Sequence, residues 1–128
     1  MSKLTALVNV ITGYLQTKSL CSEIRIVETK EFSSERFRLK IRTRLPEEHN
    51  FQISLYVNYT HIDYSYQMFS DHSLLRWDNK EEYRYLNTFP HHHHQLDGSV
   101  VPSPLTGNPM QDLRIVLHTI ERYFRELE

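Results

Sequence analysis

Four consecutive histidines, His91–His94, follow a Thr-Phe-Pro sequence in the second half of the chain. Imidazole has an ordinary pKa of about 6.5, so it exchanges protons near neutral pH. An Arg-Trp-Asp-Asn sequence precedes the run and supplies a guanidinium and a carboxylate. Two imidazoles beside a guanidinium are suited to deprotonate a ribose 2′-hydroxyl, protonate the leaving 5′-oxygen and stabilise the charge that develops. The pattern predicts RNA cleavage without a metal ion, with the candidate catalytic residues Arg76, Asp78, His91, His92, His93 and His94.

The roles within this set follow from geometry. Alternate residues of an extended segment point to the same side. Either His91 with His93, or His92 with His94, would then serve as base and acid. Arg76 would stabilise the transition state, and Asp78 would orient an imidazole. The structural alternative for the preceding motif is an Arg76–Asp78 ion pair beside a buried Trp77.

The histidine run has two other interpretations. Neutral imidazole is a good ligand for zinc, copper or nickel, and His91 with His93 would converge on an ion that Asp78 or Asp97 completes. The chain has neither an HExxH sequence nor a Cys/His spacing of a known metal site, so we expect no metal and no other cofactor. The remaining interpretation is that the histidines hydrogen-bond their own loop or bind a partner protein.

A row of basic residues alternates along residues 36–45. Residues at spacing two share one strand face about 6.8 Å apart, which is close to the phosphate spacing of an extended nucleic acid strand. Open sheets with basic and aromatic groups bind single-stranded RNA. The candidate nucleic-acid-binding residues are Arg36, Arg38, Lys40, Arg42, Arg44 and Tyr56. The alternative is pairing across strands with acidic residues, namely Glu23, Glu28, Glu31 and Asp63.

The composition narrows the class of protein. A chain of 128 residues fits one domain, which we place at residues 1–128. A net charge of −1 gives no overall attraction to nucleic acid or anionic membranes, so local clusters must supply it. The single cysteine, Cys21, excludes an internal disulfide and a cysteine-based zinc cluster, as is typical of the cytoplasm. No apolar run reaches the roughly 18 residues of a membrane span, so we expect a cytoplasmic protein without a membrane partner.

The hydrophobic periodicity predicts an α+β fold. Ser2 caps an N-terminal helix, and Asn108 and Pro109 begin a C-terminal helix with an apolar stripe. Period-two alternation predicts about five antiparallel strands in a meander, at residues 22–31, 36–45, 51–59, 62–69 and 74–78. Both helices would pack on one sheet face and leave the other face open to water. Residues 79–106 show neither period, so we expect a functional loop there.

The same residues resemble the TumE family of small prokaryotic toxins. The resemblance rests on four features, namely Tyr64-Ser65-Tyr66, Leu75-Arg76-Trp77-Asp78-Asn79, Thr88-Phe89-Pro90-His91-His92 with His94, and the closing helix. It covers about residues 60–125 and implies a single TumE-like domain. It also implies a cytoplasmic growth inhibitor that a DNA-binding antitoxin neutralises. Many relatives continue Asp-Asn with a small residue, proline and two histidines, where this chain has Lys80-Glu81-Glu82-Tyr83. The resemblance therefore implies that activity here uses the second histidine cluster alone or is altered.

Two function hypotheses follow. The first is a toxin of a toxin–antitoxin system that cuts RNA by metal-independent His/Arg chemistry, with a cognate antitoxin and an RNA substrate as partners. The second is a non-catalytic module that binds nucleic acid or a partner protein, with a metal-dependent hydrolase as a third class. A homodimer is compatible with all of them.

Overall fold

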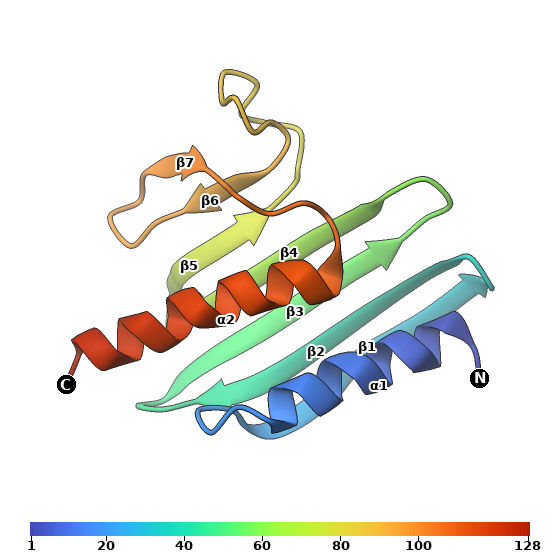
Figure 1. The fold of residues 1–128 in the computed structure, drawn as a ribbon, viewed down its shortest axis with the longest axis horizontal. Coiled ribbons are helices and arrows are strands. Elements are labelled where there is room, and N and C mark those ends of the chain that lie inside the picture. The colour runs from blue at the N-terminus through green and yellow to red at the C-terminus, as the bar shows by residue number, and fades with distance from the viewer.

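The computed structural model describes residues 1–128 as two helices and seven strands in an α-β-α order along the chain. The elements are α1 (Lys3–Gln16), β1 (Ser22–Ser33), β2 (Arg36–Leu45), β3 (His49–Val57), β4 (Ile62–Phe69), β5 (Ser73–Asp78), β6 (His92–His94), β7 (Val100–Pro102) and α2 (Pro109–Glu126). The strands form one antiparallel sheet in the order β1-β2-β3-β4-β5-β6-β7, so each strand pairs with its neighbour in sequence (Figure 1).

The meander is therefore confirmed, but the expected number of about five strands is too low. The five predicted strands are present, with β2 and β4 at the predicted ends and the other three shifted, and β6 and β7 are additional. Both lie within residues 79–106, which the sequence assigned to a loop. Each has 3 residues, too few to display a period of two, so no hydrophobic alternation reveals them.

Polar caps set the start of both helices. The Ser2 side chain accepts a hydrogen bond from the Thr5 amide at 3.0 Å, and the Asn108 side chain accepts one from the Gln111 amide at 3.1 Å. Each satisfies an amide that has no partner within its own helix. Neither helix is long and apolar enough to cross a membrane. Figure 1 shows α1 over β1 and β2 and α2 over the middle of the sheet, on the same side.

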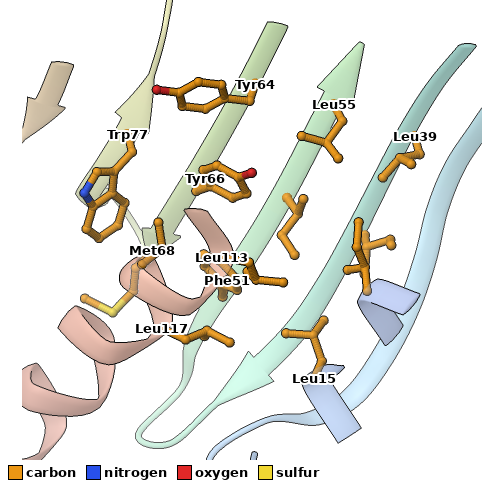
Figure 2. Close-up of a cluster of buried hydrophobic side chains, with 14 of the residues drawn as sticks. Leu15, Leu39, Phe51, Leu55, Tyr64, Tyr66, Met68, Trp77, Leu113 and Leu117 are labelled. Carbon is orange, nitrogen blue, oxygen red and sulfur yellow. The ribbon is translucent and has the colours of Figure 1, made fainter. Parts of the chain in front are cut away.

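The core lies between these helices and one face of the sheet. It holds 21 buried residues, including Leu15 of α1, Leu113 and Leu117 of α2, and Trp77 of β5 (Figure 2). Along β2 the apolar residues are buried, and the basic residues between them are exposed or half-buried. Burial of alternate apolar side chains fixes which face of each strand meets the helices, because a slip of one residue would turn the whole set to water.

The pairing register then aligns the polar residues on the opposite side of the sheet, which we call the open face. One row across the strands consists of Lys40, Ser54, Ser65, Asp78 and His92. The adjacent row consists of Arg42, Gln52, Gln67, Arg76 and His94. Directly paired residues lie on the same face. The basic strand and part of the histidine run therefore belong to one continuous polar surface.

Removing a core side chain tests this assignment of faces. Leu39 is 0% exposed. The substitution Leu39→Ala should lower the free energy of unfolding by about 2–5 kcal/mol, because the cavity left behind cannot refill. Leu96 is 56% exposed, and Leu96→Ala should stay within about 0.5 kcal/mol of wild type. Urea denaturation of both variants measures the difference. Equal losses would contradict the described core.

Candidate active site

The four consecutive histidines occupy different environments because three of them form a strand. His92 and His94 pair across β5 with Asp78 and Arg76 and lie on the open face. His93 pairs with Trp77 and lies on the core face. His91 comes directly before the first residue of β6. The pair that converges is therefore His92 with His94.

The carboxylate of Asp78 is the centre of the cluster. Its Oδ1 lies 2.9 Å from His92 Nε2, and its Oδ2 lies 3.6 Å from His94 Nε2 and 2.9 Å from Arg76 Nε. The Lys80 amide donates a further hydrogen bond to Oδ1 at 3.0 Å. A carboxylate that is only 8% exposed needs such partners, because burying an unpaired charge is costly. Asp78 holds Arg76, His92 and His94 together.

His92 is almost fully enclosed, with 1% exposure. Its Nδ1 is 3.1 Å from the Pro90 carbonyl, which can only accept, so Nδ1 carries a proton. Its Nε2 makes no hydrogen bond, although Asp78 Oδ1 lies 2.9 Å away. The centroid of the Tyr83 ring lies 4.6 Å from that of His92 and 5.9 Å from that of His94. The His92 ring is buried against it, and the His94 side chain stays 31% exposed.

His91 is paired with a tyrosine instead. Its Nδ1 lies 2.7 Å from the Tyr64 hydroxyl, and the two rings stack with centroids 5.8 Å apart. In Figure 2 the Tyr64 hydroxyl points away from Leu55 and toward β5. Burial raises the pKa of Tyr64 well above its usual value, so the phenol stays protonated at neutral pH. Burial lowers the pKa of His91, while the nearby Asp112 carboxylate opposes that shift. His91 is therefore largely neutral at pH 7.

The largest cavity, of about 730 Å³, lies where β4 begins and β5 ends. Tyr64, Arg76, Asp78 and His91 all line it, so the tyrosine–histidine pair and the arginine–aspartate pair share one space. His94 contacts this cavity only through Asp78, to which it is bound. Burial lowers the pKa of His94, and the Asp78 carboxylate partly offsets that effect.

His93 stands apart from this group. It stacks on Trp77 with ring centroids 4.4 Å apart and an interplanar angle of 8°, and its Nδ1 donates to the Arg76 carbonyl at 3.1 Å. It lines a separate groove of about 390 Å³, next to Tyr123 of α2. Burial lowers the pKa of His93. The structural alternative for the Arg-Trp-Asp motif is also present, because Arg76 pairs with Asp78 and Trp77 is 2% exposed.

Three residues that were not among the predicted site residues position this site. The Thr88 hydroxyl donates to the His91 carbonyl at 2.7 Å and accepts from the Ser103 amide, which joins the histidine run to the segment after β7. The Asn79 side chain binds the backbone of Tyr64 and continues the β4–β5 pairing past its last residue.

The third is Asp112 of α2, with 0% exposure. It accepts hydrogen bonds from the Thr106 amide and hydroxyl and from the Gly107 amide, which fixes the cavity wall that these two residues form. The sequence did offer a signal for Asp112, which is a carboxylate at a position of the apolar stripe of the helix. A charged residue at such a position is buried only when it has partners, so it indicates a hydrogen-bonded structural role.

The basic residues of β2 divide into those that pair with acidic residues and those that form no ion pair. Arg38 Nε lies 3.1 Å from Glu28, and Arg44 Nε lies 3.3 Å from Glu23, so two members pair with acids as the alternative proposed. Three others form no ion pair, namely Arg36, Lys40 and Arg42. Arg42 Nε donates to Gln52 at 2.9 Å, and Arg36 lies over the Phe32 ring. Tyr56 pairs across strands with Arg38 on the open face.

Comparison with known proteins adds one finding. The family model described as "Toxin TumE" matches residues 11–126 of the chain. That range includes the Tyr64–His91 pair, the cluster around Asp78 and all seven strands. No curated protein and no solved structure matches the chain.

The lowered pKa of His93 predicts how stability depends on pH. Its pKa is depressed in the folded chain, so below the ordinary value of about 6.5 the unfolded chain binds more protons. The free energy of unfolding should fall as pH drops through about 6.5, by at most about 1.4 kcal/mol per pH unit for each such group. His93→Gln should reduce this slope, and His118→Gln, on the exposed face of α2, should leave it unchanged. Urea denaturation between about pH 5 and 8 provides the measurement, and identical slopes in all three proteins would exclude the assignment.

Proposed function

The chain belongs to the TumE toxin family, and we propose that it acts as a ribonuclease that needs no metal ion. The family makes it the toxin of a toxin–antitoxin system, which implies a cognate antitoxin as its partner. One observation carries the ribonuclease proposal. Arg76, Asp78 and His91 line one cavity, and Arg76 and Asp78 also continue the rows of polar residues that start at the basic strand β2.

The open face supports a path for the RNA backbone. Three strand-to-strand steps separate β2 from β5, which makes roughly 14 Å, the span of a few nucleotides. Lys40 and Arg42, which form no ion pair, stand at one end of this path. Arg76 stands at the other end, at the mouth of the cavity. Backbone phosphates bound at both ends would bring a ribose and its 3′-phosphate to the cavity.

The cleavage chemistry assigns a role to each group of the site. In the His91 tautomer that we assign, Nδ1 donates to the Tyr64 hydroxyl, which leaves Nε2 to accept the proton of the ribose 2′-hydroxyl. The 2′-oxygen bonds to phosphorus, and the Arg76 guanidinium stabilises the negative charge of the phosphorane. The bond from phosphorus to the 5′-oxygen then breaks, and protonated His94, oriented by Asp78, donates a proton to that oxygen. The products are a 2′,3′-cyclic phosphate and a free 5′-hydroxyl.

The cellular setting completes the proposal. RNA lies in the cytoplasm, where the toxin would act, and the antitoxin would be a DNA-binding protein that also controls its own operon. A short reading frame for a helix-turn-helix or ribbon-helix-helix protein next to this gene would support that part. Co-purification of its product with the toxin would identify the partner.

One observation favours a second function. Arg38 and Arg44 are already paired with Glu28 and Glu23, which leaves fewer free cations for phosphate. The alternative is a toxin that binds RNA or a partner protein and does not cut. Intact RNA after long incubation, with tight and salt-sensitive RNA binding, would favour this alternative.

The first functional prediction concerns His91 as the general base. Purified wild-type protein should cut RNA in excess chelator, and His91→Gln should slow cleavage about 10²–10⁴-fold, because proton transfer by one positioned group contributes that much. The matched control is His118→Gln, an exposed histidine far along α2, which should cut at the wild-type rate. Overexpression should arrest growth with wild type and His118→Gln but not with His91→Gln. Wild-type cleavage by His91→Gln would remove the base assignment.

The second functional prediction concerns pH. Burial lowers the pKa of both His91 and His94 below the ordinary value of about 6.5. Cleavage should rise with pH as His91 loses its proton and fall as His94 loses its proton, so the maximum should lie on the acidic side of neutrality. His91→Gln should abolish the rise on the acidic limb. A rate that increases steadily to pH 9 would rule out His94 as the acid.

A further inference from the structure

A buried nitrogen without a partner raises a question that the cleavage chemistry does not answer. Nε2 of His92 faces Asp78 Oδ1 at 2.9 Å, and Nδ1 of the same ring already donates to the Pro90 carbonyl. In the neutral ring, Nε2 therefore carries a lone pair, and a carboxylate oxygen lies 2.9 Å away. Two electron-rich atoms this close repel each other unless a cation lies between them. That cation is either a proton or a metal ion.

The arrangement of three groups favours a metal ion. One ligand atom each from Asp78, His92 and His94 lies within 4.8 Å of the other two. Ligands of one zinc ion, at about 2.0–2.2 Å from the metal, are about 3–3.5 Å from each other. Each carboxylate oxygen of Asp78 lies near that range from one ring, with Oδ1 2.9 Å from His92 Nε2 and Oδ2 3.6 Å from His94 Nε2.

The short contact between His92 and Asp78, which is not a hydrogen bond, supports the same interpretation. Two ligands of one ion point at the ion and not at each other, so they approach closely without the straight alignment of a hydrogen bond. A proton shared by the pair would favour the straight alignment. Nε2 of His92 makes the short contact and no hydrogen bond.

The surroundings hold the three groups as ligands are usually held. The Pro90 carbonyl fixes the His92 tautomer that leaves Nε2 free to bind, and a ligating histidine commonly has such a backbone acceptor on its other nitrogen. Arg76 and the Lys80 amide hold the carboxylate. The Tyr83 ring packs against both imidazoles, of which His92 is buried and His94 is 31% exposed.

We propose that Asp78, His92 and His94 bind one divalent transition-metal ion, such as Zn²⁺ or Fe²⁺. Two imidazoles and one carboxylate leave at least one coordination position open, and both metals accept this ligand set. The sequence led us to expect no metal, because the spacing of the run does not reveal which alternate pair meets an acid. The antiparallel register selects His92 and His94 and places Asp78 opposite them.

Cobalt binding tests the site without reference to catalysis. Protein made without an affinity tag should take up one equivalent of Co²⁺, with the intensified visible absorption of a low-coordinate nitrogen and oxygen site, and Zn²⁺ should displace it. His94→Gln and Asp78→Asn should each weaken Zn²⁺ binding by more than about 100-fold, since loss of an outer partner alone costs 10–100-fold. No change in the Co²⁺ spectrum of wild type would overturn the proposal.

Two control variants separate this site from casual binding to a histidine-rich surface. His91→Gln removes a member of the same run that is not a proposed ligand, and His118→Gln removes an exposed histidine of α2. Both should keep wild-type affinity for Zn²⁺. Binding that survives Asp78→Asn and His94→Gln, or that falls equally in His91→Gln, would assign the metal to surface imidazoles and reject the site.

A measurement on wild type avoids reliance on variants that fold poorly. Nitrogen NMR of the imidazole rings during a Zn²⁺ titration should shift the Nε2 signals of His92 and His94 and leave His118 unchanged. Unchanged His92 and His94 signals at saturating Zn²⁺ would reject the proposal.

The metal site and the proposed cleavage can fail separately. A bound ion occupies the His94 nitrogen and the Asp78 carboxylate that the cleavage uses, so Zn²⁺ should inhibit RNA cleavage and chelator should restore it. Metal binding to a protein that never cuts RNA would keep the site and reject the ribonuclease. Cleavage without any metal binding would do the reverse.

Discussion

The charge of a single buried carboxylate organises the functional half of this protein. Asp78 is 8% exposed, and it is surrounded by the Arg76 guanidinium, the imidazoles of His92 and His94, and a backbone amide. A carboxylate in such a place is stable only while those partners stay in position. It therefore links β5 to β6 through side chains, in addition to the backbone pairing of the two strands.

The two faces of the sheet divide the chemistry from the packing. On the core face, Trp77 stacks with His93, and both lie among the buried residues under α2 or beside its groove. On the open face, the same two strands present Arg76 with Asp78 and His94 with His92. Because side chains alternate along a strand, the Arg-Trp-Asp motif and the histidine run each place some residues in the core and others in the site. The four histidines do not act as one group, although they are adjacent in sequence.

The loop between β5 and β6 contributes the rest of the site. Tyr83 covers the imidazoles of the cluster, and Lys80 supplies both an amide to Asp78 and a wall of the cavity. The loop thus packs an aromatic ring against His92 and His94, beside the cluster of arginine, aspartate and histidine.

The sequence alone determined the α+β class, the helix starts at Ser2 and Asn108, the antiparallel meander and the TumE resemblance, because periodicity and capping are local properties. It also identified Arg76, Asp78 and the histidine run as the residues to examine. Only the tertiary structure decided which imidazoles meet the carboxylate, because that depends on the register between β5 and β6, and three residues are too few to encode a register by pattern. The same holds for the Tyr64 contact with His91 and for buried Asp112, since both join elements that are distant along the chain.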